Sequence, residues 1–370
     1  MIKISFYIIM ICLYNLLCIY VYMMHSISKE KRINKKLESI DIEIGKLIAN
    51  EIENVKENKE INSNTISKIK KLSKRPTYKK YLCDYLLNKL DEDKDTVIEF
   101  VKRTNILGEV LNSSDNKSSH KLYKIKYIGE FKIDRYFGYL VENCKDNSIY
   151  IQIACLKALS KLGDIKYFLD GLENIVNTST LIHEKILVEN IRFFEGNRFE
   201  LNKLLEENLK IDNNELKKII LTYFIEIKYE QGENTIYELM KKSYDDKEIL
   251  ISCIKYFIRI KSIRVKLKLM NLLEDSNWEV RALSAIALKN YEDKEVIHRL
   301  KESIKDENWY VRQNSADSLY TILKDKNKIL DIIYGNDRYA SDAILTILSE
   351  VGNLEEYISD ISEISIPVAN

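Results

Sequence analysis

Glycine and proline are scarce in this sequence, which has only ten glycines and two prolines among its 370 residues. Strands and tight turns usually depend on these residue types, because glycine reaches backbone conformations that other residues avoid and proline fixes the angle φ. A chain built largely of strands and tight turns is therefore excluded, and the composition favours an all-α fold.

Sequence motifs for catalysis and metal binding are also missing. The chain has no G-x-x-x-x-G-K-[ST] phosphate loop, no G-x-G-x-x-G dinucleotide turn, no G-x-S-x-G nucleophile elbow and no H-E-x-x-H zinc motif. Its four histidines are dispersed, and its six cysteines form no C-x-x-C pair. We therefore expect no catalytic activity, no metal and no cofactor, and we interpret the cysteines as buried, reduced thiols.

A surplus of one sign of charge is missing as well, since 58 basic and 57 acidic residues leave a formal net charge of +1. The near-neutral total charge therefore identifies no class of partner. Because nucleic-acid binding usually depends on a basic surplus, we do not expect a nucleic-acid partner. Two local runs, residues 67–81 and 257–270, are basic and contain no acid. The first is a candidate site for anionic lipid headgroups, and the alternative is a solvated helix face. Its basic residues are Lys68, Lys70, Lys71, Lys74, Arg75, Lys79 and Lys80.

The N-terminal segment 4–24 carries no charge, and Asn15 is its only strongly polar residue. A helix of this length spans about 30 Å, the thickness of a bilayer's hydrocarbon core, so we predict a transmembrane anchor. The alternative is a cleaved signal peptide, which would need a basic start, a shorter apolar run and a small-x-small cleavage site. Only Lys3 precedes the run, and no Ala-x-Ala follows it.

The residues after this segment predict its orientation. A cluster of five basic residues follows the apolar run: Lys29, Lys31, Arg32, Lys35 and Lys36. By the positive-inside rule, the N-terminus lies outside the cell membrane and the rest of the chain lies in the cytoplasm. We therefore expect a single-pass membrane protein.

A charged connecting helix is predicted over residues 26–64. Beneath its lysines and glutamates runs an apolar series at steps of three and four, which marks one face of an α-helix. The series is Ile33, Leu37, Ile40, Ile44, Ile48, Ile52 and Val55. We expect it to pack on the first repeat; a short self-associating coiled coil is the alternative, but no seven-residue repeat is sustained.

An internal repeat occupies the C-terminal part of the chain. The segment DSNWEVRALSAIALKNY at 275–291 returns as DENWYVRQNSADSLYTI at 306–322, thirty-one residues later. A fixed period of this size predicts stacked helical hairpins, none of which can bury its apolar face alone. Weaker copies lie at 146–164, 213–227 and 247–260. Gly129, Gly163 and Gly352 are suited to left-handed helix caps between repeats.

The two strong copies resemble HEAT repeats, specifically the short bacterial kind similar to those of phycobilin lyases. The resemblance rests on the Asp, Val-Arg, Ala and Leu of Asp275–Leu288 and Asp306–Leu319. It implies an α-solenoid over residues 65–363, preceded by the anchor at 1–25 and followed by a tail at 364–370.

In the HEAT family the Arg and Asp commonly form a polar ladder between neighbouring repeats. Here that role would fall on Asp275, Arg281, Asp306 and Arg312. The same helix position holds Gln152 or Leu250 in weaker copies, so we expect a discontinuous ladder.

Trp278 and Trp309 open the helices of the two strong copies. As exposed residues they would be candidate anchors for a partner protein. We favour structural packing instead, because tryptophan usually contributes most when it is buried. Asp275 and Asp306, which precede these helices, are placed to accept from the first helical amides.

We expect the solenoid to act as a membrane-tethered scaffold that offers its surface to another membrane-associated protein. The resemblance suggests an accessory subunit of a membrane or cell-envelope enzyme, such as a glycosyltransferase. The alternative is a lyase-like HEAT-repeat enzyme, or a binder of a small ligand, that acts at the concave face.

Overall fold

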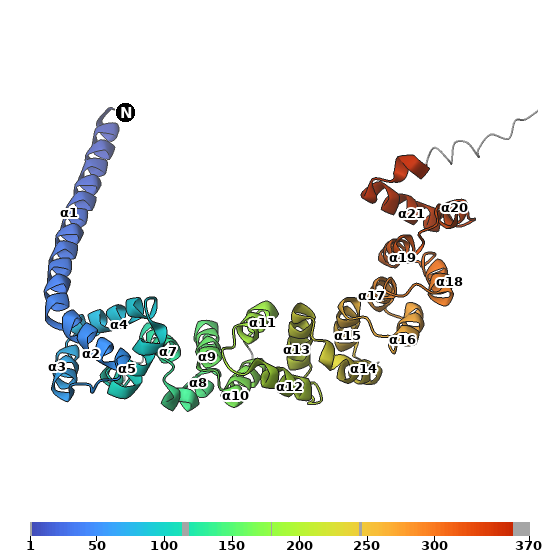
Figure 1. The fold of residues 1–370 in the computed structure, drawn as a ribbon. Coiled ribbons are helices and arrows are strands. Elements are labelled where there is room, and N and C mark those ends of the chain that lie inside the picture. The colour runs from blue at the N-terminus through green and yellow to red at the C-terminus, as the bar shows by residue number, and fades with distance from the viewer. Residues whose placement is uncertain (1, 113–117, 179, 244–245, 358–370) are drawn as a thin grey trace, which may run out of the picture. The chain divides into compact units, whose positions relative to one another are not determined.

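The computed structural model describes residues 2–112, 118–178, 180–243 and 246–357, and every regular element in these ranges is helical. The prediction of an all-α chain is therefore confirmed over the described ranges, while the predicted tail at 364–370 lies outside them. The chain divides into two compact units, Met1–Leu162 and Gly163–Asn370 (Figure 1).

The first unit begins with the long helix α1 (Ile2–Ile40), which passes through the π-helical turn η1 (Asp41–Gly45) into α2 (Lys46–Lys56). It continues with α3 (Ser63–Ser73), α4 (Pro76–Leu90), α5 (Lys94–Thr104), α6 (Gly108–Leu111), α7 (Ser118–Glu130), the short η2 (Asp134–Tyr136), α8 (Phe137–Asn143) and α9 (Ile149–Leu162). Helix α4 contacts α3 and α5, and α9 contacts both α7 and α8.

The apolar series of the connecting helix packs inside this unit. Ile40, Ile44, Ile48, Ile52 and Val55 are all buried. Helix α2, which carries the last three, contacts α5. The side chains of Ile33 and Leu37 lie outside the described residues. The structure thus favours packing on the first unit over the coiled-coil alternative, because the described part of the apolar face is already covered.

The predicted membrane anchor is not supported by the structure. Residues 4–24 do lie in α1, but the side chains of residues 2–9 and 11–12 are outside the described residues. In the part of the chain that the structure describes, no helix is both long enough and apolar enough to cross a membrane. This finding overturns the predicted single-pass localisation, with the N-terminus outside and the solenoid in the cytoplasm.

The second unit is a stack of helical hairpins. Its helices are α10 (Ile165–Val176), α11 (Glu184–Arg192), α12 (Arg198–Asn208), α13 (Asn214–Ile227), η3 (Glu230–Gly232), α14 (Glu233–Lys242), α15 (Lys247–Arg259), α16 (Lys266–Asn271), η4 (Leu272–Glu274), α17 (Trp278–Leu288), α18 (Lys294–Ser303), α19 (Trp309–Ile322), α20 (Lys326–Ile333) and α21 (Arg338–Val351). In one layer each helix contacts the next one: α13 contacts α15, α15 contacts α17, α17 contacts α19, and α19 contacts α21. Helices α14, α16, α18 and α20 each contact the helix that follows them (Figure 1). This is the two-layered stack that the repeat predicts.

The matching positions of the two strong copies lie in the core of this stack. Val280 and Val311 are 1% and 0% exposed, and Leu288 and Leu319 are fully buried. Small residues sit between them, as at Ala285, and let neighbouring helices approach closely. The hydrophobic pattern therefore sets which face of each helix turns inward.

The helix beginnings differ in one detail from the prediction. The side chains of Asn277 and Asn308, not those of the aspartates, cap α17 and α19 by accepting from the amides of Glu279 and Tyr310. Asp275 and Asp306 instead accept from the amides of the two capping asparagines, at 2.8 Å each. The aspartates therefore brace the turn before the helix and leave a carboxylate oxygen available to another partner.

Two of the three predicted glycine caps are confirmed. Gly163 and Gly352 have positive φ angles of 75° and 80°, which glycine adopts without strain. Gly129 does not cap a helix. It lies inside α7, where its missing side chain lets the helix approach Ala158 of α9.

The cysteines of the helical body are free and buried, as predicted. They are Cys83, Cys144, Cys155 and Cys253. The prediction is wrong for Cys18 in α1, which is exposed, and the side chain of Cys12 lies outside the described residues. Burial raises the pKa of the Cys83 thiol to about 11, so this thiol stays protonated at neutral pH. Such thiols act as small core residues.

Candidate functional site

Four large aromatic side chains stand exposed at the beginnings of three neighbouring helices of the second unit, α17, α19 and α21. Trp278 is the first residue of α17, and Trp309 and Tyr310 are the first two residues of α19. Tyr339 is the second residue of α21. Their exposed fractions are 38%, 54%, 55% and 62% in that order. These four residues are called the aromatic surface below.

Three rings of the aromatic surface, those of Trp278, Trp309 and Tyr310, are in contact across two neighbouring repeats. Trp278 and Tyr310 stack with ring centroids 5.2 Å apart and an interplanar angle of 22°. Tyr310 in turn meets Trp309 edge-on, at 5.0 Å and 76°. Each such pair stabilises the arrangement by about 0.5–1.5 kcal/mol, so these three rings form one continuous surface and are not separate exposed side chains.

Helix geometry explains why the tryptophans face outward. Residues two positions apart on an α-helix point about 200° apart around its axis. Val280 and Val311 are turned into the core, so Trp278 and Trp309, two positions earlier, are turned away from it. The expectation that both tryptophans pack in the interior is therefore wrong for Trp309 and only partly met for Trp278.

Tyr310 and Tyr339 were missed by the sequence analysis. A signal was present, because each lies immediately before the third residue of its helix, and that residue, Val311 or Ala340, is buried. The repeated sequence showed the tryptophans as a pair, whereas the tyrosines are not thirty-one residues apart. Only the stacking of the helices places Tyr310 against Trp278 and Tyr339 against Arg312.

One rung of the predicted polar ladder joins α17 to the turn before α19. Nε and Nη2 of Arg281 donate to the two carboxylate oxygens of Asp306, at 2.7 and 2.9 Å. Nη1 of Arg281 donates to the carbonyl oxygens of Asp275 and Ser276. The pair is largely shielded from solvent, with side-chain exposures of 11% and 12%.

The environment of Asp306 keeps it ionised. Burial disfavours the charged carboxylate, but the hydrogen bonds from Arg281 and the Asn308 amide outweigh it, as do the nearby charges of Arg281 and Arg312. The pKa of Asp306 therefore lies below its ordinary value. A bidentate, charge-assisted contact of this kind is among the stronger polar interactions in proteins.

The ladder does not continue on either side of this rung. In the preceding repeat the position equivalent to Arg281 holds Leu250, so that position offers no guanidinium to Asp275. On the other side, Nη1 of Arg312 donates to the carbonyl oxygens of Asp306 and Glu307, at 2.8 and 2.9 Å. Its guanidinium carbon lies 4.8 Å from the ring centroid of Tyr339.

The predicted basic cluster lies in α3, α4 and the turn between them. Lys68, Lys71, Lys74, Arg75 and Lys80 are exposed, and Lys70 and Lys79 are partly buried. Arg75 lies 5.7 Å from the ring centroid of Tyr78. Within the described ranges none of the seven basic side chains forms an ion pair with an acid, so the local positive charge is not compensated by direct contacts.

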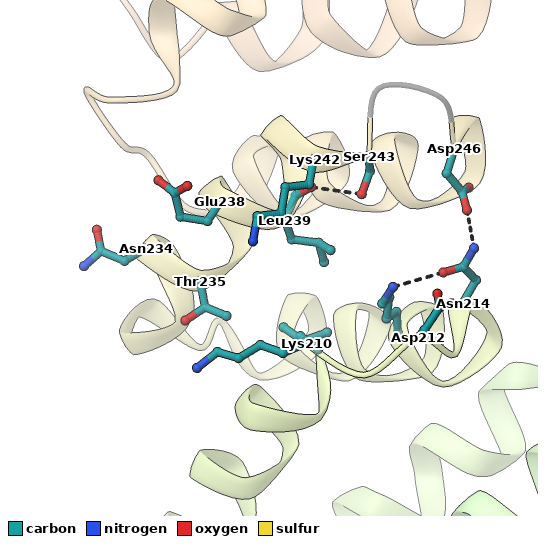
Figure 2. A pocket seen from close by; sticks show the side chains of 12 residues that line it. Lys210, Asp212, Asn214, Asn234, Thr235, Glu238, Leu239, Lys242, Ser243 and Asp246 are labelled. Atoms are coloured by element: carbon teal, nitrogen blue, oxygen red, sulfur yellow. Dashed lines mark hydrogen bonds between the residues drawn. The ribbon is translucent and has the colours of Figure 1, made fainter.

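A cavity of about 680 Å³ opens in the second unit beside α13 and α14. Figure 2 shows Lys242 of α14 and Lys210, which follows α12, on facing sides of this space. Its rim carries Asn214, whose amide donates to the carboxylate of Asp246. Polar and charged residues line the cavity together with Leu209 and Leu239, and no histidine or cysteine is among its described residues. Nor does any described group of His, Cys, Asp and Glu have the arrangement of a metal site.

A comparison with known protein families identifies one part of the chain as similar to HEAT repeats. Residues 266–334 match the sequence profile of HEAT repeats, and this range contains α17, α19 and the Arg281–Asp306 rung. No curated protein matches the chain. HEAT repeats generally mediate protein–protein interaction through the extended surface of a helical stack. The segment that carries most of the aromatic surface is thus similar to helical interaction scaffolds.

Proposed function

We propose that this chain is a binding scaffold, not an enzyme, and that a partner protein docks on the aromatic surface. The observation that carries the proposal is the exposure of Trp309 and Tyr310 beside the half-covered Trp278, in mutual contact. Tryptophan and tyrosine are enriched among the residues that contribute most to protein interfaces. A contiguous exposed aromatic patch is typical of an interaction site.

Contacts inside the chain give little reason for Trp309 to be aromatic. Its only described ring contact is the edge-on approach to Tyr310, and about half of its surface meets solvent. Phe199 in α12 provides a comparison, since it is 79% exposed and lies outside the aromatic surface. A single exposed aromatic residue needs no explanation, whereas three rings in contact across two repeats favour a binding role.

The test replaces Trp309 with a photo-crosslinking phenylalanine analogue in the full-length protein within its native cells. We expect crosslinks from position 309 to one partner chain and none from a matched probe at position 199. Crosslinks that are equal at both positions, or confined to the chain itself, would contradict the proposal. The same experiment would identify the partner, and it would test whether that partner is an envelope enzyme such as a glycosyltransferase.

The purified partner then allows affinity to be measured. Replacing Trp309 with alanine removes a central contact, and residues of this kind contribute about 2 kcal/mol or more, or about 30-fold in Kd. Phe199→Ala should leave Kd unchanged. Circular dichroism provides the control that both variants remain helical.

A second candidate function, binding of a small ligand, is favoured by the cavity at Lys210 and Lys242. A ligand held there would raise the melting temperature in a metabolite screen, and Lys242→Ala would remove that shift.

The anionic-lipid role of the basic cluster likewise stays a prediction. If the cluster binds anionic lipid, the full chain should bind vesicles that contain phosphatidylserine and should not bind uncharged vesicles. Added salt should weaken this binding.

A further inference from the structure

The end of the polar ladder lies at the edge of the aromatic surface. Arg281 and Arg312 occupy the same helix position, thirty-one residues apart, and their Nη1 atoms make the same pair of hydrogen bonds to the preceding turn. The two guanidinium groups differ in what their Nε and Nη2 atoms contact. Nε and Nη2 of Arg281 hold Asp306, whereas in the described residues Nε and Nη2 of Arg312 have neither a hydrogen bond nor an ion pair.

The register of the turns explains this difference. The acid of each rung lies three residues before the first residue of the next helix, as Asp275 does before Trp278 and Asp306 before Trp309. Helix α21 begins at Arg338, so the corresponding position is Gly335. Glycine has no carboxylate, and the next rung therefore lacks its acid.

The acids close to Arg312 along the chain have other partners. Glu307 lies 3.7 Å from Nη2 of Arg281, and Asp317 lies 3.6 Å from Lys289. Asp306 is held by Arg281, and Asp337 caps α21 by accepting from the amide of Ala340. Asp342 lies 3.8 Å from Arg338. None of these carboxylates is in place to complete the rung.

The open edge of Arg312 is also placed next to the aromatic rings. Trp309 and Arg312 are three residues apart on α19 and so share a face of the helix. The guanidinium carbon of Arg312 lies over the ring of Tyr339, 4.8 Å from its centroid, and Tyr339 is itself 62% exposed. A planar cation fixed on one side, stacked on a ring and open at the fork is suited to bidentate recognition of a carboxylate.

We propose that the partner presents an aspartate or glutamate carboxylate to Nε and Nη2 of Arg312, with a neighbouring apolar or aromatic residue against Trp309. The partner thereby completes the rung that Arg281 and Asp306 form within the chain. This inference rests on the proposed function, because it assigns the chemistry of the segment that docks on the aromatic surface. It identifies the occupant as an acidic peptide segment of another protein.

The experiment uses the full-length chain and a phage-displayed library of random 12-residue peptides. We expect the selected peptides to share one Asp or Glu close to an apolar or aromatic residue. Selected sequences without tryptophan are then synthesised and titrated by tryptophan fluorescence. Because the chain has only two tryptophans, Trp278 and Trp309, the signal reports on the aromatic surface alone.

Two substitutions test the rung from opposite directions. Arg312→Lys keeps the positive charge but loses the fork, and it should weaken binding at least tenfold, whereas Arg259→Lys on α15 should have no effect. Gly335→Asp should supply the missing acid from within the chain, raising the melting temperature and weakening the peptide. Gly335→Ala is the control, since it adds the same Cβ near the Ile332 carbonyl oxygen without a carboxylate.

The outcomes separate this inference from the proposed function. If Trp309→Ala removes binding while Arg312→Lys and Gly335→Asp bind normally, the docking surface stands and the acid recognition is wrong. If Trp309→Ala has no effect on peptides that bind, the proposed surface itself is wrong.

Tighter peptide binding after truncation at Tyr357 would show that residues 358–370 occupy the site. Fluorescence that changes with protein concentration alone would show a second copy there. Either of these two results overturns an external acidic partner.

Discussion

The Arg281–Asp306 pair shows at the scale of single residues how two repeats are joined. The guanidinium bridges the turn before its own helix and the carboxylate of the next repeat. Both side chains are almost covered, so their charges are poorly solvated and depend on each other. An isolated surface pair such as Lys324–Glu292 is exposed by 75% and 61% and should contribute much less.

We predict that Asp306→Asn lowers the free energy of unfolding at pH 7 by about 2 kcal/mol, because Arg281 loses its charge-assisted acceptor. Glu292→Gln, the matched control at the exposed pair, should change it by about 0–1 kcal/mol. Urea unfolding followed by circular dichroism measures both. Equal small effects would mean that the rung contributes no more than a surface ion pair.

The pH dependence of the same variant provides a separate prediction. The folded-state pKa of Asp306 lies below the ordinary value of 3.8, so the ionised carboxylate stabilises the fold above that pH. This stabilisation is lost as the pH falls through the folded-state pKa. The stability difference between wild type and Asp306→Asn should therefore be constant above about pH 5 and shrink below 3.8. A difference that is unchanged at pH 2.5 would exclude ionisation of Asp306 as its cause.

At the scale of helices, close approach depends on small residues at defined points. A Cβ placed on Gly129 of α7 would lie 2.9 Å from both Cα and Cβ of Ala158 in α9. Real side chains do not come so near, so these two helices fit only because position 129 is glycine. The sequence suggested a helix cap for Gly129, whereas the structure makes it a packing residue.

We predict that Gly129→Ala lowers the free energy of unfolding by about 1–3 kcal/mol, although alanine is the better helix former. Gly138→Ala in α8 is the control, since nothing lies within 4 Å of the added Cβ. That control should be neutral or stabilise the protein by up to about 1 kcal/mol. Equal stability of the two variants in urea unfolding would show that α7 and α9 can separate without cost.

At the scale of the whole second unit, stability depends on neighbouring hairpins. Helix α17 contacts both α15 and α19, whereas in the described residues the only stacking neighbour of α21 in this row is α19. In a stack of repeats, the stability of each hairpin is roughly the sum of its intrinsic folding free energy and the free energies of its interfaces with neighbouring hairpins. The hairpin of α20 and α21 should therefore open more readily than that of α16 and α17.

Hydrogen exchange measures this difference. We expect amides of α21 to exchange faster than those of α17 under native conditions. Leu288→Ala, which removes a fully buried side chain, should destabilise the unit by about 2–5 kcal/mol and speed exchange in both α17 and α19. Slow exchange throughout α21 would mean that its open side is covered.

The sequence was informative about elements wherever a pattern is local. The thirty-one-residue repeat at 275–291 and 306–322 predicted helical hairpins, and the steps of three and four predicted the buried face of α2. The membrane prediction was also local, since it counted apolar residues over 4–24, and the described part of the helix does not support it. The weaker repeats show the limit of pattern matching, because Leu250 removes a rung without changing the packing.

By itself the sequence determined the helical class, the repeating hairpins and the buried valines and leucines, because each follows from the spacing of apolar residues along one helix. Only the tertiary structure decided that Trp309 faces solvent, that Tyr310 and Tyr339 join it, and that Arg312 has no acid opposite it. Exposure and pairing depend on side chains from neighbouring repeats. A change of register such as Gly335 alters those neighbours while leaving the pattern within each helix intact.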